Sequence, residues 1–165
     1  SDVYKRQGLA YQVLEAAKMV TAGKSIADIL QQLTKIRNNT RIFFSVRNNQ
    51  QIVNNRIIGK LRGFLGKHAN TAYMIGFKQN DFTLIAHGSK DESLNNFWKS
   101  QMELMHDECI VKLSILHSGT SERAEFLRNM LNEEFPFVPI SIAPTNPEMT
   151  TFIGRESTGV TYLLG

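Results

Sequence analysis

Two kinds of hydrophobic spacing alternate along this chain, and their order limits the folds open to it. Five segments have the spacing of amphipathic helices, in which apolar residues recur every three or four positions. They are residues 9–20, 26–36, 57–65, 94–105 and 124–131. Other, shorter segments have the β-branched and aromatic character of strands. They are residues 42–46, 72–77, 82–86, 109–116 and 137–143. This order predicts an α+β fold, with helices layered on a mixed, partly antiparallel sheet. A helical hairpin precedes the sheet in the sequence.

The helical hairpin has clear start and stop signals. Gly23 closes the first helix as a C-terminal cap, and Ser25 caps the second helix with Asp28 three positions later. Apolar residues of the second helix share one face, which we expect to be its buried stripe. They are Ile26, Ile29, Leu30, Leu33 and Ile36. On the first helix, Leu9, Val13, Ala16, Ala17 and Val20 recur at the same spacing.

Composition limits the class of protein. With 165 residues, 42% hydrophobic and 21% charged, the chain fits one ordinary globular domain. No apolar run approaches the length of a membrane span and no signal sequence opens the chain, so a cytoplasmic location is expected. Cys109 is the only cysteine, which excludes an intrachain disulfide. Its alternating surroundings predict a small apolar side chain within a strand rather than a nucleophile.

The charge is unevenly distributed. Between Asp28 and Asp81 there is no acidic residue but there are nine lysines and arginines. Outside this segment ten basic residues face fifteen acidic ones, a balance of −5 in a chain of net charge +4. The resulting basic face could receive a nucleic acid, a phosphorylated or carboxylated ligand or an acidic protein, or it could simply be a solvated surface.

No strong catalytic or metal-binding motif is present. Residues 154–161 have the spacing of a phosphate-binding loop, but Val160 stands where that loop requires lysine. The spacing of the four histidines matches no short metal-binding pattern. The sequence therefore predicts no enzyme, no cofactor and no metal. Trp98, Met102 and Met105 are expected in the core, although methionine would also suit a lipid cavity.

The order of short motifs resembles the DegV family of bacterial fatty-acid-binding proteins. Residues 7–17 resemble a family helix of the type Q-G-x-x-x-x-x-E-A-A, and residues 23–29 resemble its G-K-S-x-x-(D/E)-I element. Residues 40–46 resemble the strand before the family's G-G-R-I turn, which corresponds here to Asn54-Asn55-Arg56-Ile57. A short helix at 59–66, the hairpin at 72–86 and the strand and turn at 114–119 follow in the expected order.

The last segment departs from the family pattern. Residues 142–159 resemble a terminal segment that usually carries H-x-G-P-G and lies close to the lipid carboxylate. Glu156 stands where the family has histidine, and Thr158-Gly159-Val160 replaces Gly-Pro-Gly. A glutamate there would repel a carboxylate unless Arg155 or a proton compensates.

The resemblance implies a carrier without chemistry of its own. A long-chain fatty acid would lie between this domain and an N-terminal α/β domain, and would be presented to a fatty-acid kinase. Residues 1–7 are interpreted as a non-native remnant, 8–37 as the hairpin that ends the N-terminal domain, and 38–165 as the lipid-binding domain. We expect fatty-acid or partner binding at Arg56, Phe64, Leu65, His117, Arg155, Glu156 and Ser157.

Within this set, Arg56 is expected to recognise ligand or partner, and Phe64 and Leu65 to line the tail pocket. The main alternative is a nucleic-acid-binding module that uses the basic segment 35–78, where basic residues lie near aromatic ones. It is the weaker hypothesis, because the aromatic residues of this segment are needed in the core and on the apolar face of a helix.

Overall fold

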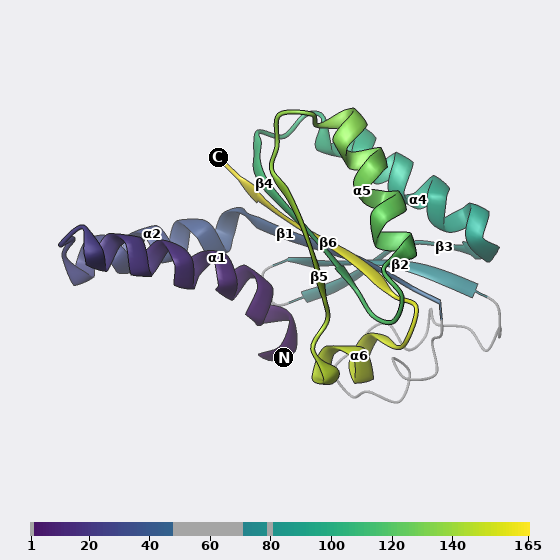
Figure 1. The fold of residues 1–165 in the computed structure, drawn as a ribbon, viewed down its shortest axis with the longest axis horizontal. Coiled ribbons are helices and arrows are strands. Elements are labelled where there is room, and N and C mark those ends of the chain that lie inside the picture. Colours follow the sequence, from purple (N-terminus) through teal and green to yellow (C-terminus); the bar gives the residue numbers. More distant parts are fainter. Residues whose placement is uncertain (1, 48–70, 79–80) are drawn as a thin grey trace.

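A six-stranded sheet forms the centre of the molecule. The computed structural model describes residues 2–47, 71–78 and 81–165 (Figure 1). The strands are β1 (Thr40–Val46), β2 (Thr71–Lys78), β3 (Asp81–Ser89), β4 (Ile110–His117), β5 (Ile140–Pro144) and β6 (Thr158–Leu164). Their order across the sheet is β3-β2-β1-β6-β4-β5. Only β4 and β5 pair in parallel, so the predicted mixed, partly antiparallel sheet is confirmed.

Strand direction brings three strand ends to one edge. Both β1 and β4 pair antiparallel to β6, and β5 runs parallel to β4. The carboxyl ends of β1, β4 and β5 therefore meet beside the start of β6. We call this end of the sheet the carboxyl edge; it carries Val46, His117, Pro144 and Thr158.

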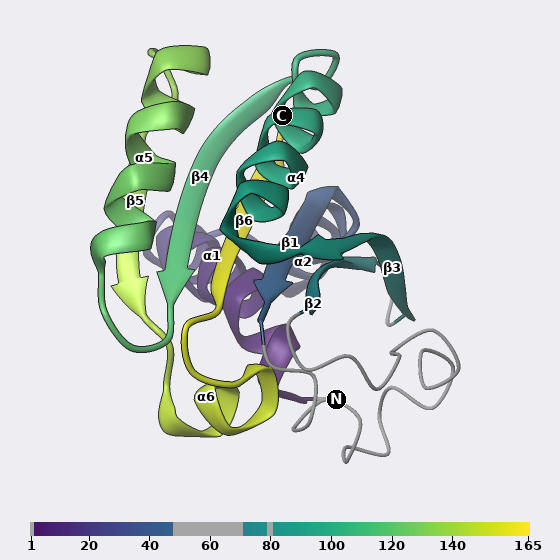
Figure 2. The same cartoon turned by 90° about the vertical axis from the view of Figure 1, so that its right-hand side faces the viewer.

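Helices α4 (Lys90–Met105) and α5 (Glu122–Glu134) cover one face of the sheet (Figure 2). The apolar side chains between these helices and the sheet form the main core: Met74, Trp98, Met102, Met105, Leu113, Ile115, Ala124, Leu127, Leu131, Val160 and Tyr162. The prediction that Trp98, Met102 and Met105 lie in the core is confirmed. Tyr162 is also stacked on Phe43, with ring centroids 5.9 Å apart.

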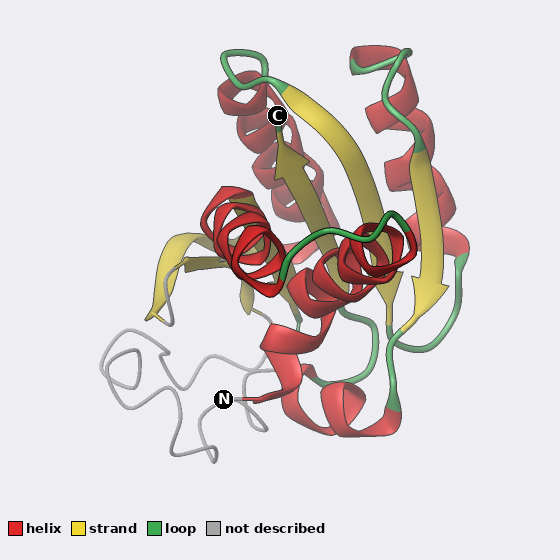
Figure 3. Cartoon of the chain, turned by 90° about the vertical axis from the view of Figure 1, so that its left-hand side faces the viewer, coloured by secondary structure: helices red, strands yellow, loops and turns green. Residues whose placement is uncertain are grey.

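Helices α1 (Asp2–Thr21) and α2 (Ile26–Asn39) form the predicted hairpin on the opposite face (Figure 3). Both expected caps are present. Gly23 has the positive φ of 67°, and the Ser25 hydroxyl accepts a hydrogen bond from the Asp28 N–H. The division of the chain at residues 7 and 37 stays a prediction; α1 itself begins at Asp2.

One contact between the hairpin and the sheet is polar. The Tyr11 hydroxyl lies 2.8 Å from Ser114 Oγ and donates to the Thr161 carbonyl at 3.3 Å. Ser114 Oγ in turn lies 2.8 Å from Ser141 Oγ on β5. Lys112 Nζ lies 5.0 Å from the centre of the Tyr11 ring, in cation-π geometry. Hydroxyl groups therefore contribute to holding the hairpin on the sheet, beside the buried Ile36 of α2.

The prediction of a buried stripe on α2 is confirmed at Ile36 but is wrong for the outer turns. Ile36, next to the sheet, is buried, but Ile26 and Leu30 are exposed, as are Leu9, Val13 and Val20 on α1. The reason is visible in Figure 1, where the hairpin extends away from the sheet and its outer turns have no other layer against them. Helical spacing showed which residues share a face, but not whether this chain covers that face.

Smaller differences concern strand ends. β4 begins one residue after Cys109, which is exposed rather than part of the strand. β5 begins at Ile140, and Phe137 lies in the preceding turn with its side chain exposed. Helix α6 (Pro147–Ile153) and β6 were not predicted. Much of the segment that resembles a phosphate loop is in fact the start of β6, a central strand.

Candidate functional site at the carboxyl edge

Two turns meet at the carboxyl edge. One follows β4 at Ser118 and Gly119, and the other joins α6 to β6 through residues 154–157. Gly119 and Gly154 have φ values of 87° and 84°, which glycine adopts without steric cost. Glu156 has a φ of 65° in the same turn, a conformation that is uncommon for a residue with a side chain. Tertiary contacts must hold this strained residue in place.

Ser118 holds the two turns together. Its Oγ accepts a hydrogen bond from the Ser157 N–H at 2.9 Å and donates to the Gly154 carbonyl at 2.6 Å. Its own N–H donates to the Ser157 carbonyl at 3.0 Å, and its carbonyl accepts from the Glu156 N–H at 3.1 Å. Ser118 is buried, so its hydroxyl acts as a structural bridge between the turns rather than as an exposed nucleophile.

Glu156 forms an ion pair across the edge. Its Oε2 lies 3.3 Å from a terminal nitrogen of Arg47, the residue that follows β1. The Arg47 side chain is 25% exposed and the Glu156 side chain 66%. The compensating cation is thus Arg47, contributed by another strand, while Arg155 beside Glu156 is exposed. Because Glu156 is mostly hydrated, the pair contributes little to stability, at most about 1 kcal/mol.

The other residues expected in the site differ in their burial and in their hydrogen-bond partners, and three of them are not described. His117 is half-buried at the end of β4, and its Nδ1 lies 3.1 Å from the Gly119 carbonyl oxygen. Ser157 is buried, and its hydroxyl donates to the Ile153 carbonyl at 2.7 Å. The structure therefore brings His117, Glu156 and Ser157 to one edge, together with Arg155. Arg56, Phe64 and Leu65 lie outside the described residues.

Sequence reasoning missed Arg47 and Ser118 as members of this edge. Arg47 directly follows a strand that was predicted correctly, and Ser118 directly follows another. Their positions at strand ends were visible in the sequence. What was missing was the strand order, which places β1 and β4 on the two sides of β6.

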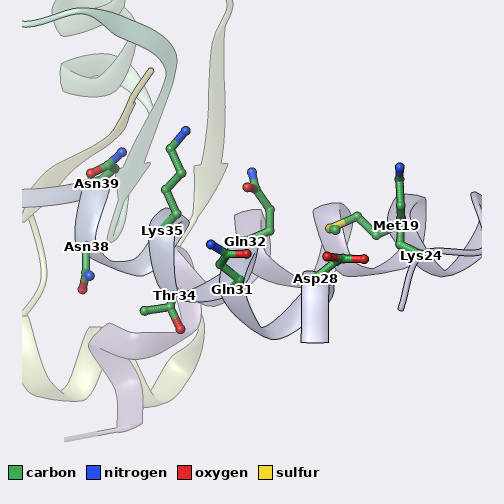
Figure 4. Close-up of a pocket in the computed structure, with 9 residues that line it drawn as sticks. All are labelled: Met19, Lys24, Asp28, Gln31, Gln32, Thr34, Lys35, Asn38 and Asn39. Atoms are coloured by element: carbon green, nitrogen blue, oxygen red, sulfur yellow. The ribbon is translucent and has the colours of Figure 1, made fainter. Parts of the chain in front are cut away.

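A hollow lies on the helical hairpin. This open groove of about 800 Å³ runs from the hairpin tip to its base and is shown in Figure 4. Its lining is mostly polar: Met19, Lys24, Asp28, Gln31, Gln32, Thr34, Lys35, Asn38 and Asn39. The groove differs from a fatty-acid site, which needs apolar walls for the tail.

Two further kinds of feature are absent from the described residues. No group of three or more histidine, cysteine, aspartate or glutamate side chains there could hold a metal ion. None of the described helices combines the length and the apolar character that crossing a bilayer requires. The phosphate-loop hypothesis has no support from the fold, because a strand stands where the motif requires a helix.

Comparison with known proteins identifies the family. The model of the DegV family, described as an uncharacterised protein family, matches residues 5–164. This chain belongs to the DegV family. The resemblance inferred from short motifs is therefore confirmed, and the α+β fold agrees with it.

Relatives share the fold at low sequence identity. A DegV domain-containing protein of Streptococcus pneumoniae is 22% identical over 151 residues, which are 92% of this chain and 54% of that protein. A fatty-acid-binding DegV family protein of Thermus thermophilus superimposes with a TM-score of 0.79 at 17% identity, over 96% of this chain and 57% of the other.

The Streptococcus pneumoniae Fatty Acid Kinase (Fak) B3 protein, solved with linoleic acid bound, gives a TM-score of 0.79 at 14% identity. It is covered over 56% of its length by 95% of this chain. This chain thus spans slightly more than half the length of the relatives it matches. At these identities the structural likeness establishes the fold.

Proposed function

We propose that the protein containing this chain binds a long-chain fatty acid and carries it without performing chemistry on it. The observation that carries this proposal is membership of the DegV family, together with structural likeness to a fatty-acid-binding family member and to a protein solved with linoleic acid bound. The likeness to a protein of a fatty acid kinase further supports a finer proposal, that the bound acid is presented to such a kinase.

Apolar and charged side chains lie close together at the carboxyl edge. Phe44 and Val46 on β1 are fully buried, as is Ile75 on the neighbouring β2. The next residue along β1 is Arg47, a cation that already holds a carboxylate, that of Glu156. Buried apolar side chains of the sheet and a cation that can hold an acid group therefore lie next to each other.

Mass spectrometry of bound lipid tests the carrier proposal. The full-length protein would be purified from bacteria without detergent, and its extracted lipids would be quantified against protein. About one fatty acid per protein is expected, because a buried site retains its ligand through purification. A preparation with fatty acid far below this ratio, and no uptake of added oleic acid, would contradict the proposal.

Salt dependence separates the carrier from the nucleic-acid alternative. Fatty-acid retention in a buried cavity should change little between about 50 and about 500 mM salt, a range that runs from weak to strong screening of charges. Nucleic-acid binding through the basic segment 35–78 would weaken steeply over that range. Of the basic side chains there, Arg47 is engaged by Glu156, and Arg41 donates to the Asn38 and Thr40 carbonyls.

The Arg56 assignment has its own test. The variant Arg56→Ala in the full-length protein should weaken fatty-acid binding or slow phosphorylation of the bound lipid by a fatty-acid kinase. The variant Lys60→Ala, which removes a charge four positions later in the sequence, serves as the control. If Arg56→Ala changes neither binding nor phosphorylation, Arg56 has no role in recognition. The same two assays, with Phe64→Ala and Leu65→Ala, test the expected tail pocket.

A further inference from the structure

The end of the sheet opposite the carboxyl edge carries acidic and exposed apolar side chains together. There the last turns of α4 and α5 meet: His106 Nε2 lies 2.7 Å from Glu134 Oε2, and the rings of His106 and Phe135 have centres 5.1 Å apart. Both helix ends lie near the start of β4, far from α6 (Figure 2). We call residues 103–111 and 132–140 the acidic end.

Phe137 stands at the tip of a rigid turn in the acidic end. The Val138 N–H donates to the Phe135 carbonyl at 3.1 Å, which closes a turn with Pro136 at its second position. Proline fixes the backbone there, and Phe135 and Val138 on either side pack against the main core. The Phe137 side chain itself is 97% exposed. Because its backbone is already ordered, contact through this ring costs little conformational entropy.

Two further apolar side chains are exposed in the same ranges. Leu104 near the end of α4 is 64% exposed, and Val111 near the start of β4 is 45% exposed. Single exposed apolar residues are common on folded proteins. Three of them at one end of a sheet, one being an almost fully exposed aromatic ring, mark an interaction surface.

The charge around these residues has one sign. No lysine or arginine occurs between Lys99 and Lys112, or between Arg128 and Arg155. Lys112 itself lies against the Tyr11 ring, on the hairpin side of the sheet. The acidic end has five acidic residues, which are Glu103, Asp107, Glu108, Glu133 and Glu134.

Helix ends add to this negative potential. The C-terminal end of a helix carries partial negative charge, and a basic residue in the last turn usually balances it. Neither α4 nor α5 has lysine or arginine in its last turn, and α5 has Glu133 and Glu134 there. A cation from outside would therefore be stabilised at the acidic end.

The charge and shape of this surface decide which partner fits it. Nucleic acids and anionic membranes are negatively charged and are repelled, whereas a surface rich in lysine and arginine is attracted. Phe137 protrudes, so its partner must offer an apolar pocket that takes the ring and excludes water around it. A folded protein with such a pocket meets both conditions.

We propose that the acidic end is a docking surface for a separate protein that has an apolar pocket bordered by lysine and arginine. Phe137 is the anchor that fills the pocket, and Asp107 and Glu133 attract the basic border. The surface lies roughly 23 Å from the carboxyl edge, because seven residue steps of β4 separate them. The inference is therefore independent of the ligand that the protein carries.

Photocrosslinking with the full-length protein tests the proposal in the cells from which it comes. The photoreactive analogue p-benzoylphenylalanine would replace Phe137 in one variant and Phe126 in another. Phe126 is the matched control, because it is also an exposed phenylalanine, at 52%, but lies beside the ion pair of Arg128 with Glu125. The protein captured after irradiation would be identified by mass spectrometry, purified and titrated against the full-length protein.

Position 137 should capture one protein that position 126 does not, and Asp107→Lys with Glu133→Lys should abolish the capture. In the titration, Phe137→Ser should weaken binding at least about tenfold, whereas Phe126→Ser should change it less than about twofold. Binding should also weaken between about 50 and about 500 mM salt. An unchanged denaturation midpoint in Phe137→Ser and in the charge-reversed variant confirms that both remain folded.

Capture of no protein at position 137, or the same protein at both positions, would overturn the proposal. A product formed with a second copy of this chain, or within the same full-length chain, would also overturn it, since the occupant is then not a separate protein. Capture that survives the charge reversal would remove the basic border from the proposal and so contradict it. Lipid content of the variants, measured separately, reports on the carrier function alone.

Discussion

The two faces of the central sheet are covered in different ways. On one face α4 and α5 press a continuous apolar layer onto the strands, and side chains such as Leu127 and Met105 are almost completely buried. On the other face the hairpin buries Ile36 and forms the hydrogen bonds of Tyr11 with Ser114 and Thr161, but it leaves aliphatic side chains exposed further out. Apolar spacing is present in both layers, so spacing alone does not indicate that a layer is completed within the chain.

The largest expected effect lies in the apolar layer. Leu127→Ala should lower the free energy of unfolding by about 2–5 kcal/mol, because it opens a cavity among residues that cannot collapse into it. Urea denaturation of the full-length protein measures this. Leu104→Ala on α4 is the control, since Leu104 is exposed and should change stability by less than about 0.5 kcal/mol. Similar losses for both variants would mean that burial does not decide the contribution of this layer.

A substitution at the hydrogen-bonded carboxyl edge should lower the free energy of unfolding by less than Leu127→Ala does. Ser118→Ala leaves the buried Ser157 N–H without its acceptor and the Gly154 carbonyl without a donor. A loss of about 1–3 kcal/mol in unfolding free energy is expected. Ser141→Ala removes an exposed serine that bonds to Ser114, and it should cost much less. Equal costs would show that the two turns are held by other contacts.

Alkaline pH should act through Tyr162. Burial raises the pKa of this phenol above its ordinary value of 10.0, and its hydrogen bond to Glu108 and the charge of Glu108 raise it further. Above pH 10 the unfolded chain releases the proton while the folded chain keeps it, so stability falls as pH rises. The denaturation midpoint should therefore fall less between about pH 8 and about pH 11 in Tyr162→Phe than in the wild type.

At neutral pH the same variant should lose about 1.5 kcal/mol with the hydrogen bond to Glu108. An identical pH dependence of the variant and the wild type would assign the alkaline loss to other groups. Tyr11, whose pKa is also raised by burial, is the first of these to test.

The polar contact of the hairpin predicts a loss of about 1 kcal/mol for Tyr11→Phe. The variant loses both hydrogen bonds of the hydroxyl but keeps the ring beside Lys112. A double-mutant cycle with Ser114→Ala isolates the coupling between the two side chains. A coupling near zero would mean that the hairpin is held on the sheet by something other than this hydroxyl pair.

The smallest effect is expected at Glu156. Both Glu156→Gly and Glu156→Ala remove the ion pair with Arg47, so the difference between them reports on the backbone. Because φ is 65° at this position, the glycine variant should be more stable than the alanine variant by about 0.5–1 kcal/mol in thermal or urea denaturation. An alanine variant as stable as the glycine variant would indicate that the turn relaxes to an ordinary conformation.

The sequence predicted the helices and strands better than it predicted which of them lie side by side in the fold. Caps at Gly23 and Ser25 were recognised because they are local, and the β2–β3 hairpin because its turn is short. The ion pair between Arg47 and Glu156 could not be predicted, since it joins residues 109 positions apart and depends on β6 lying beside β1. That strand was overlooked because glycine and threonine at its start resemble a phosphate loop.

The position of β6 also has a consequence for how the chain is assembled during synthesis. Of the six strands, β6 is made after all the others, yet it lies between β1 and β4 and bonds to both. Until it leaves the ribosome, the β1–β2–β3 unit and the β4–β5 unit each present an open edge that could pair with the wrong strand. Completion of the sheet therefore waits for Thr158–Leu164, whose insertion joins two units that have no direct strand pairing with each other.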